Sequence, residues 1–329
     1  MRKVELGRSG IQVSVVALGT WPMVGDANWG PQDERDSVAT IQEALDLGIN
    51  FFDTAEAYGD GYAESLLGKA LGKRRKEAVI ASKVSQNHLR YEQVKKACEG
   101  SLSRLGTDWI DLYQVHWPNR DVPFEETFRA LLDLQREGKI RAIGVSNFGV
   151  EDLREALRFA PVQSNQLPYS LLWRAIEYEI LPLCRENGVS VLCYSPLLMG
   201  LLTGKFRSPD EVPPGRARTR HFSSSRPLTR HGEPGQEELT FETLARIRAI
   251  ADRLGVGMEH LALAWLLKQS GVASVLVGAR NPAQIRENAR AAEVELADDA
   301  VEELNRVTEP LKEAFGPNPD MWQSESRYR

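Results

Sequence analysis

The chain has 329 residues, a length that fits two average domains or one α/β barrel with insertions. Hydrophobic residues make up 42% and charged residues 26%, so the chain can bury a sizeable core and has the composition of an ordinary soluble protein. The net charge of -5 and the lack of a dominant basic run argue against a nucleic-acid partner, because an acidic protein repels phosphates.

The cysteines, the histidines and the first residues bear on compartment and metal content. Cys98, Cys184 and Cys193 have neither close pairing nor metal-ligand spacing, and the five histidines are scattered, so we expect reduced thiols and no metal site. The sequence begins without a secretory signal and has no apolar run long enough to span a bilayer. We therefore predict a cytoplasmic protein with no membrane partner.

Helical periodicity alternates with short apolar runs along most of the chain. Polar and apolar residues first alternate around residues 8–10, which predicts a β-hairpin before a first strand at 15–18. Helical spacing follows at 33–47, 62–72, 91–104, 123–136, 150–159 and 173–187. The apolar runs are continuous, as in parallel strands buried on both faces, and lie at 15–18, 51–52, 79–80, 110–115, 142–145, 162–166, 189–194 and 275–277. Eight strands predict a single (β/α)8 TIM barrel, one domain over residues 1–329.

Two irregular segments interrupt this alternation. Residues 200–238, after the seventh strand, are rich in Pro, Gly, Arg and Ser and have little apolar periodicity. Residues 315–329 are also irregular and contain Trp322. Because a loop as long as the first one is usually functional or mobile in a compact domain, we consider both segments candidate lids.

Polar residues follow the apolar runs where each strand is expected to end. Asp53, Lys83 and His116 are 30 and then 33 positions apart, about the length of one strand-helix-strand unit, and Tyr58 comes shortly after Asp53. Barrel enzymes draw their catalytic groups from the carboxyl ends of several strands, so we expect these four side chains to meet. The later strand ends add Ser146, Asn147, Gln166, Tyr194, Ser195 and residues 278–280.

The first four residues suit proton transfer to a carbonyl group. A tyrosine is a weak acid unless its phenolate is stabilised, which Lys83 would do while Asp53 kept Lys83 charged and oriented. His116 could orient a carbonyl oxygen or pass a proton. The sequence has no nucleophile motif, so hydride from a reduced nicotinamide is the natural complement.

Glycine-rich nucleotide motifs are missing from the sequence. Neither G-x-G-x-x-G nor G-x-x-x-x-G-K-[ST] occurs, and the nearest match, residues 68–73, is one residue short. A dinucleotide would therefore have to bind without the usual glycine turn. Barrels commonly bind phosphate at the loops after strands seven and eight, which here carry Ser195, Pro196, Leu197, Gly200, Lys205 and Arg280.

Several segments, in order, make the chain resemble the aldo-keto reductases over nearly its whole length. They include GINFFDTAEAYGDGYAESLLGKAL, VIASKV, LGTDWIDLYQVHWP, GKIRAIGVSNF, NQLPYSLLWR, CYSPLLMGLLTGKF and SVLVGARNPAQIRENA. Through HWP, GLLTGK and GAR it is most similar to the bacterial general-stress reductases, an NADPH-dependent branch. The resemblance implies reduction of aldehydes or ketones to alcohols, with a small-molecule carbonyl compound as substrate.

The resemblance also implies roles for individual residues. The catalytic tetrad would be Asp53, Tyr58, Lys83 and His116, with Tyr58 as general acid. The nicotinamide end of the coenzyme would be bound by Trp21, Asp53, Ser146, Asn147, Gln166 and Tyr194, the last stacking on the ring. The pyrophosphate would be covered by Ser195, Pro196, Leu197, Gly200 and Lys205, and the adenosine end surrounded by Gly278, Arg280, Gln284 and Asn288.

Coenzyme preference and substrate are less well specified by the sequence. The family generally prefers NADP(H), but Gly278 and Ala279 stand where Lys and Ser or Thr are frequent, which leaves Arg280 as the clear cation for a 2′-phosphate. Trp21 and Trp117 follow predicted strand ends and are expected to line the substrate pocket with Tyr58 and His116, although tryptophans are commonly packing residues.

Other readings of the same residues stay open. Taken singly, Asp53 could cap a helix, Lys83 could lie on the surface, Tyr194 could be a core aromatic, and Arg280 could pair with an acidic neighbour. At the level of the whole chain, the alternative is a nicotinamide-binding regulatory subunit similar to the potassium-channel β-subunits. Neither the oligomeric state nor the physiological substrate follows from any pattern in the sequence.

Overall fold

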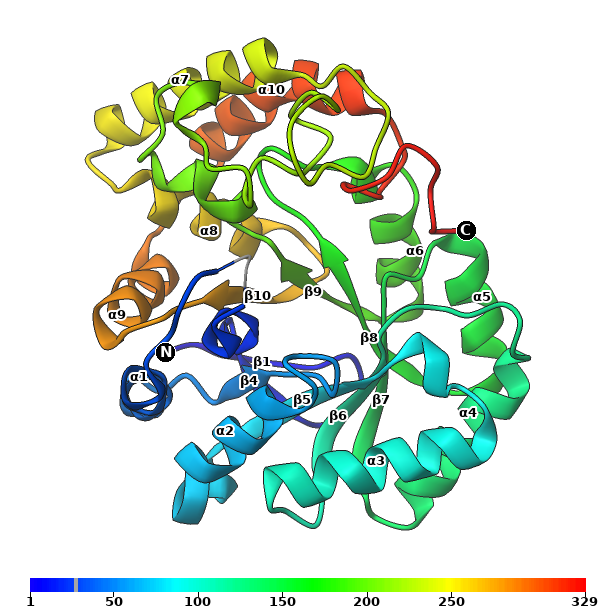
Figure 1. The fold of residues 1–329 in the computed structure, drawn as a ribbon. Helices are drawn as coiled ribbons and strands as arrows, with labels where there is room; N and C mark the ends of the chain where they lie inside the picture. The colour runs from blue at the N-terminus through cyan, green and yellow to red at the C-terminus, as the bar shows by residue number, and fades with distance from the viewer. Residues whose placement is uncertain (27–28) are drawn as a thin grey trace.

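The computed structural model describes residues 1–26 and 29–329 and contains a closed barrel of eight parallel strands (Figure 1). The strands follow one another around the barrel in chain order, and the last pairs with the first. They are β3 (Val16–Gly19), β4 (Phe51–Asp53), β5 (Val79–Val84), β6 (Ile110–Val115), β7 (Ile140–Ser146), β8 (Val162–Pro168), β9 (Ser190–Tyr194) and β10 (Val272–Gly278). The barrel predicted from the sequence is confirmed, and its parallel register brings all carboxyl ends together at one end.

An antiparallel hairpin closes the opposite end of the barrel. Its strands are β1 (Lys3–Glu5) and β2 (Gln12–Ser14), as the alternating sequence pattern predicts. Leu6, Ile11 and Val13 are buried in one apolar cluster with Phe51 and Leu112 from inside the barrel. The hairpin therefore seals the amino ends of the strands, and a reaction site has to form at the carboxyl ends.

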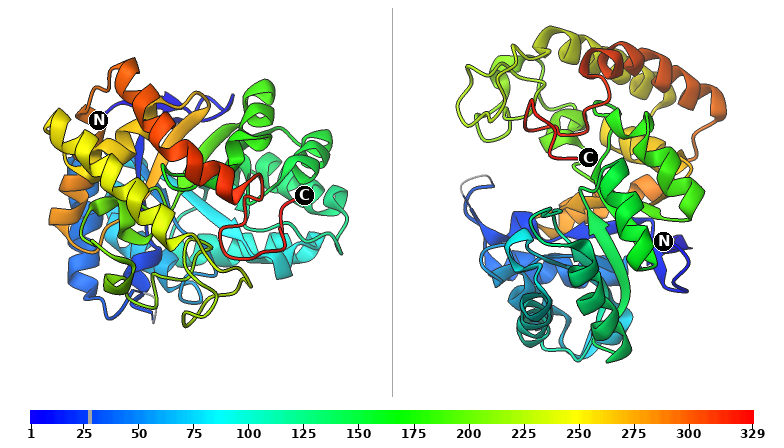
Figure 2. Two further views of the ribbon diagram at one scale, coloured as in Figure 1. Left: turned by 90° about the horizontal axis from the view of Figure 1, so that it is seen from above. Right: turned by 90° about the vertical axis from the view of Figure 1, so that its right-hand side faces the viewer.

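Helices cover the outside of the barrel (Figures 1 and 2). Those that follow the strands in turn are α1 (Glu34–Asp46), α2 (Tyr62–Leu71), α3 (Tyr91–Leu105), α4 (Phe124–Arg136), α5 (Val150–Phe159), α6 (Ile180–Asn187), α8 (Met258–Lys268) and α9 (Pro282–Arg290). Two longer helices, α7 (Glu237–Leu254) and α10 (Asp298–Phe315), pack against each other outside this ring. Within the described part of the chain, no helix is long and apolar enough to cross a membrane.

The helix expected at 173–187 is shorter in the structure. A 3₁₀ turn at Ala175–Glu177 precedes α6, which begins only at Ile180. Pro182 has no backbone N–H and is tolerated only in the first turn of a helix, so α6 cannot begin much earlier. Before it, the guanidinium of Arg174 donates hydrogen bonds to Glu177, to the carbonyl oxygen of Asn305 and to Thr308. Contacts with α10 thus hold the start of this segment outside the helix, and single-segment periodicity could not show them.

The two irregular segments lie together over the open end of the barrel (Figures 1 and 2). Between β9 and α7 the regular structure is limited to 3₁₀ turns at Leu198–Thr203 and Pro209–Glu211. The backbone nitrogen of Arg220 donates to the carbonyl oxygen of Met321, which joins this loop to the tail segment, defined here as residues 316–329. Both candidate lids are therefore tied to each other.

Candidate active site

A buried lysine connects the first three polar strand-end residues. The ammonium nitrogen of Lys83 lies 2.7 Å from Oδ1 of Asp53, 2.9 Å from the carbonyl oxygen of Thr54 and 3.1 Å from the hydroxyl of Tyr58. Lys83 is completely buried within β5, and Asp53 is the last residue of β4. The structure thus brings these side chains together as the spacing predicts, and it excludes a surface position for Lys83.

The protonation states in this cluster follow from burial and charge. Burial raises the pKa of Tyr58 above its ordinary value of 10.0, and the Lys83 ammonium only partly opposes that shift. Burial disfavours a charged Lys83, but the interactions with Asp53 and Tyr58 together outweigh it and raise the lysine pKa. Burial, with the Lys83 charge, lowers the pKa of His116 to about 3. At neutral pH the cluster therefore holds a protonated phenol, an ammonium and a neutral imidazole.

The second oxygen of Asp53 links this cluster to the neighbouring strand ends. Gln166 on β8 donates to Oδ2 of Asp53 at 2.8 Å. The hydroxyl of Ser146, at the end of β7, donates to the carbonyl oxygen of Gln166 at 3.1 Å. Asn147 donates to Ser146 at 3.0 Å and to the carbonyl oxygen of His116 at 3.0 Å. Four strand ends are consequently joined in one hydrogen-bonded network.

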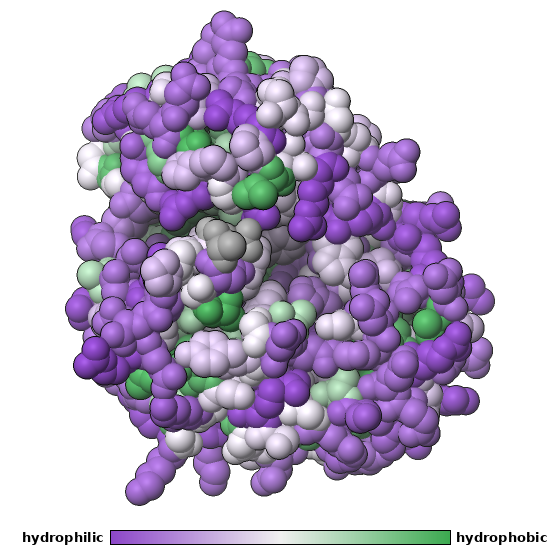
Figure 3. Space-filling model, viewed as in Figure 1, coloured by the Kyte–Doolittle hydropathy of each residue, from purple (hydrophilic) through white to green (hydrophobic). Residues whose placement is uncertain are grey.

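A cavity of about 960 Å³ opens above this network, where the space-filling view is hollowed near its centre (Figure 3). Every coenzyme and substrate residue expected from the sequence lines it, together with Tyr58, His116 and Asp53. Lys83 is the exception, because it lies behind Tyr58 with no exposed surface. The geometry thus gathers the predicted residues around one volume, and their individual roles are proposed below.

Two cations flank Gly200 in the wall of the cavity. A β-carbon at Gly200 would lie 3.0 Å from Nζ of Lys205 and 3.3 Å from Nη1 of Arg216, and the backbone there has a φ of 91°. Burial lowers the pKa of both side chains, and neighbouring cations lower it further, Arg216 acting on Lys205 and Arg280 on Arg216. Such a cluster is stabilised by anions that enter the cavity.

Arg280 is held by the loop after the first barrel strand rather than by an acidic neighbour. Its Nε donates to Oε1 of Gln32 at 2.7 Å, and Nη1 donates to the carbonyl oxygen of Trp29 at 2.7 Å. Its third nitrogen donates to the carbonyl oxygen of Pro31. Gln284 accepts a hydrogen bond from the backbone nitrogen of Arg280 at 2.8 Å. Arg280 therefore spans the loop between β3 and α1 at one edge of the cavity.

Aromatic side chains form the wall beside Tyr58. Trp21 lies parallel to the Tyr58 ring at a centroid distance of 6.1 Å, and His116 meets it edge-on at 5.8 Å. Trp117 is faced by the guanidinium of Arg327, 3.9 Å from its ring centroid. Both tryptophans chosen from the sequence therefore border the space next to Tyr58.

Sequence reasoning missed several residues that line the cavity or border it. They come from the two segments without periodicity and include Arg216, Arg218, Arg230, Arg327 and Tyr328. The run GRARTR at 215–220 was a usable signal, since closely spaced arginines in a long loop favour an anion site. Tyr328 gave no such signal.

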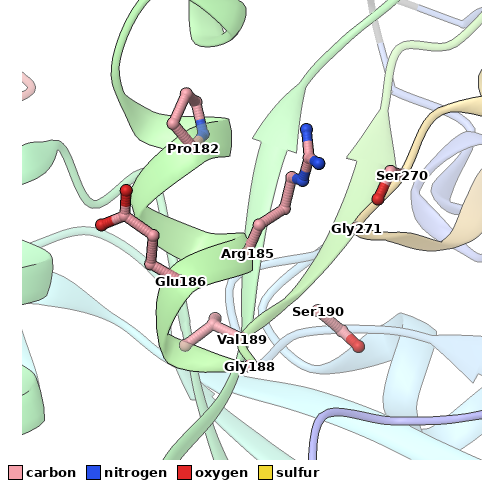
Figure 4. A pocket seen from close by; sticks show the side chains of 8 residues that line it. All are labelled: Pro182, Arg185, Glu186, Gly188, Val189, Ser190, Ser270 and Gly271. Carbon is pink, nitrogen blue, oxygen red and sulfur yellow. The ribbon is translucent and has the colours of Figure 1, made fainter.

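A second hollow, of about 580 Å³, lies at the amino end of β9 (Figure 4). Figure 4 shows Arg185 of α6 projecting toward the side of Ser190 and Ser270, while Glu186 points the other way. Among the residues that line it, only Arg185 and Glu186 are titratable. Its lining provides no acid-base pair comparable to Tyr58 and Lys83, so the cavity at the carboxyl ends remains the candidate active site.

One group of side chains in the described part of the chain has the residue types of a metal site. Single ligand atoms of Glu259, His260 and Glu287 come within 4.8 Å of one another. The Nε2 atom of His260, however, lies 2.9 Å from the carbonyl oxygen of Glu287, so that nitrogen is already engaged in a hydrogen bond. In this arrangement Nε2 of His260 is not available to bind a metal ion.

Comparisons with known proteins bear on the origin of this arrangement. The model of the aldo/keto reductase family matches residues 15–309. The chain belongs to the aldo/keto reductase family. The family prediction made from the sequence is confirmed, and membership makes the chain an oxidoreductase.

Relatives in this family span nearly the whole chain. Aldo-keto reductase YhdN of Bacillus subtilis is 35% identical over 96% of this chain and 97% of its own length. The NADH-specific methylglyoxal reductase of Escherichia coli is 37% identical over 95% of this chain and 100% of its own. A crystal structure of an aldo/keto reductase from Klebsiella pneumoniae with NADP and acetate is 32% identical, with a TM-score of 0.74 over 93% of this chain and 95% of that one.

One relative bears on the regulatory alternative. A putative voltage-gated potassium channel subunit beta of Schizosaccharomyces pombe is 34% identical over 93% of this chain and 92% of its own length. The chain is therefore similar in sequence both to proteins named as reductases and to a protein named as a channel subunit.

Proposed function

We propose that the protein reduces aldehydes or ketones to alcohols with a reduced nicotinamide coenzyme, NADP(H), and that Tyr58 is the general acid. The observation that carries this proposal is the Lys83 ammonium, which contacts Asp53 and the Tyr58 hydroxyl at 2.7 Å and 3.1 Å at the edge of an open cavity. A buried phenol beside a fixed cation can lose a proton to a nearby oxygen, because the cation stabilises the phenolate that remains.

The cavity fits a dinucleotide in its size and in the chemistry of its walls. Its volume of about 960 Å³ is at the upper end of small-molecule sites. Lys205 and Arg216 supply positive charge, and Gln166 lines the same cavity as Asp53 and Tyr58. When bound, the reduced nicotinamide would supply the hydride, which this chain has no group of its own to provide.

The chain's own residues would manage the proton and the carbonyl oxygen. Tyr58 transfers its proton to the carbonyl oxygen as negative charge develops there, and Lys83 stabilises the resulting phenolate. His116, neutral because burial lowers its pKa to about 3, can donate one N–H to the same oxygen. Trp21 and Trp117 border this space and keep water away from it.

The relatives differ in the nicotinamide coenzyme with which they are named or crystallised. The relative in Escherichia coli is named as NADH-specific, whereas the structure from Klebsiella pneumoniae holds NADP. Lys205, Arg216 and Arg280 line the same cavity. Their charges repel, since Arg216 lowers the pKa of Lys205 and Arg280 lowers the pKa of Arg216. Arg280 suits the extra charge of a 2′-phosphate, which favours NADPH.

The test is oxidation of NADPH in the presence of 4-nitrobenzaldehyde, with Tyr58→Phe as the decisive variant. Loss of the phenolic proton should lower kcat by about 100-fold or more, while NADPH binding, followed by fluorescence, changes little. Tyr62→Phe is a matched control, because Tyr62 is exposed and its hydroxyl bonds only to Glu34. Full activity of Tyr58→Phe would remove Tyr58 from the mechanism.

The regulatory alternative is supported by the likeness to a putative channel subunit beta. Such a role predicts coenzyme binding without turnover. A panel of aliphatic and aromatic aldehydes and ketones separates the two, since measurable kcat on any of them that Tyr58→Phe abolishes favours the enzyme. Binding of NADPH with no turnover across the panel would favour the regulatory subunit.

A further inference from the structure

The hydroxyl of Tyr328 enters the hydrogen-bonded network from a residue 181 positions away from Asn147. It donates to Oδ1 of Asn147 at 2.6 Å and lies 3.3 Å from the hydroxyl of Tyr194. Tyr328 is 7% exposed, so this contact is shielded from solvent. Asn147 and Tyr194 are two of the residues assigned above to the nicotinamide end of the coenzyme.

Asn147 uses its complete hydrogen-bonding capacity in this arrangement. Its side-chain oxygen accepts from Tyr194 at 3.0 Å and from Tyr328 at 2.6 Å. Its side-chain nitrogen donates to the carbonyl oxygen of His116 and to Ser146, both at 3.0 Å. An amide has two acceptor positions and two N–H groups, so all four are occupied. A reversed amide would place its oxygen against the carbonyl oxygen of His116, and the orientation is therefore fixed.

We propose that Tyr328 is a positioning residue that holds Asn147 and the ring of Tyr194 in the orientation needed to align the nicotinamide for hydride transfer. The inference rests on the proposed function, because it assumes that Asn147 and Tyr194 face the nicotinamide. Without the Tyr328 hydroxyl, Asn147 loses its shorter acceptor contact and Tyr194 loses a neighbour of its hydroxyl. The oxygen side of the Asn147 amide would then be held by Tyr194 alone, so the positions of both side chains would be less tightly restrained.

Ionic and stacking contacts hold the tail segment next to the cavity. The guanidinium of Arg327 donates to both carboxylate oxygens of Asp320, at 2.6 Å and 2.9 Å, and Asp320 is completely buried. The same guanidinium covers the ring of Trp117, which Tyr328 meets edge-on at 5.5 Å. A buried bidentate pair of this kind fixes direction as well as distance.

A second anchor lies outside the cavity, at the start of α5. The carbonyl oxygen of Arg329 accepts hydrogen bonds from the backbone nitrogens of Glu151 at 2.8 Å and Asp152 at 3.2 Å. Gly149 makes this approach possible, because a β-carbon there would lie 2.1 Å from the Arg329 carbonyl oxygen. The residues on both sides of Tyr328 are thus fixed independently of the side chain itself.

The first variant is Tyr328→Phe, which removes the hydroxyl and keeps the ring against Trp117. Loss of one buried hydrogen bond should raise the NADPH dissociation constant, measured by fluorescence, by about 3- to 10-fold. It should also lower kcat and enlarge the primary isotope effect measured with 4-deuterated NADPH, while the KM for 4-nitrobenzaldehyde stays within twofold. Tyr178→Phe is the control, because Tyr178 is an exposed tyrosine outside the cavity.

The second variant, Gly149→Ala, displaces the tail segment by a substitution at a residue that does not itself line the cavity. The added methyl group cannot be accommodated 2.1 Å from the Arg329 carbonyl oxygen, so the segment must shift. The changes in dissociation constant and isotope effect should have the same direction as in Tyr328→Phe. In the double variant they should be smaller than the product of the single effects, because both substitutions act through one contact.

The outcomes separate this inference from the proposed function. Turnover that Tyr58→Phe abolishes, together with a Tyr328→Phe enzyme identical to wild type, would sink the positioning role alone. So would a Tyr328→Phe enzyme in which only the aldehyde KM rises, since that marks a wall of the substrate pocket. A lowered melting temperature with unchanged isotope effect would reduce Tyr328 to a packing residue. No turnover in the wild type on any carbonyl compound would instead overturn the proposed function.

Discussion

The ammonium of Lys83 and the carboxylate of Asp53 form an ion pair at 2.7 Å from which solvent is almost completely excluded. Among the described residues, the other contacts of the Lys83 ammonium are the neutral oxygens of Thr54 and Tyr58, and the other side-chain contact of the Asp53 carboxylate is the neutral amide of Gln166. Breaking such a pair leaves one buried charge without compensation, which costs far more than removing both partners. The pair therefore affects stability and, in the proposed mechanism, proton transfer from Tyr58.

Asp53→Asn should lower both activity and stability. The uncompensated Lys83 ammonium should reduce the free energy of unfolding by about 3–5 kcal/mol, and lowering the lysine pKa should weaken its stabilisation of the Tyr58 phenolate. Urea unfolding and kcat measure the two effects. The double variant Asp53→Asn/Lys83→Met should recover much of the stability but none of the activity. Equal stability of the single and double variants would show that the ion pair is not the cause.

Stability should fall as the pH falls below 6.5, in proportion to the number of buried neutral histidines. Burial lowers the pKa of both His116 and His221 from 6.5 to about 3. Between those values the unfolded chain binds protons that the folded chain does not, so each histidine costs about 1.4 kcal/mol of stability per pH unit. Urea unfolding at several pH values should show this slope. The slope of the free energy of unfolding against pH should be smaller by about 1.4 kcal/mol per pH unit in His116→Gln, and by the same amount in His221→Gln.

The rate of carbonyl reduction should show no titration near pH 6.5. His116 stays neutral there, and burial raises the Tyr58 pKa above 10.0, so both groups keep one protonation state from about pH 5 to pH 9. The check is a profile of kcat against pH with saturating NADPH. A step in kcat near pH 6.5 that disappears in His116→Gln would contradict the protonation state assigned to this histidine.

Lys205 and Arg280 should affect coenzyme binding differently. If Lys205 contacts the pyrophosphate, Lys205→Met should weaken NADPH and NADH alike, whereas Arg280→Gln should weaken NADPH by about 10-fold more than NADH. Gln32→Ala is the control for Arg280, because it removes one contact that holds the guanidinium and keeps its charge. Equal losses of both coenzymes in Arg280→Gln would place the 2′-phosphate elsewhere.

Two helical glycines should respond to alanine in opposite ways. Alanine favours helices by about 1 kcal/mol over glycine, so propensity alone predicts stabilisation at both Gly68 and Gly100. At Gly68 in α2, however, a β-carbon would lie 2.3 Å from the carbonyl oxygen of Leu105. At Gly100 in α3 it meets only the flexible end of Arg104, at 3.1 Å. Thermal unfolding should therefore show a lower Tm for Gly68→Ala and an unchanged or higher Tm for Gly100→Ala.

The barrel was predictable because its strands are short, continuously apolar and regularly spaced. Residues 110–115 were predicted as a strand, and β6 has these bounds in the structure. The segment 173–187 was misjudged in part because the weight of Pro182 was overlooked, and in part because Arg174 is held by Asn305 and Thr308, more than 100 positions away. Local periodicity carries no information on such a contact.

The candidate site was predictable where its residues follow strands. Asp53, Lys83, Gln166 and Tyr194 all lie at or near strand ends, so the barrel itself brings them together. Arg216 and Tyr328 come from segments without periodicity, and their positions depend on contacts between those segments. Their approach to the cavity could be recognised only from the structure.

The carboxylate of Asp53 divides its two oxygens between Lys83 and Gln166, at 2.7 Å and 2.8 Å. A substitution at Gln166 therefore affects Tyr58 through the Asp53 carboxylate and Lys83. Gln166, Asp53, Lys83 and Tyr58 are for that reason expected to change together or not at all. Lys205 and Arg280 have no such link to Asp53. If Arg280 sets the coenzyme preference as proposed, descendants of this chain could exchange one coenzyme for the other while the Asp53, Lys83 and Tyr58 contacts stayed intact.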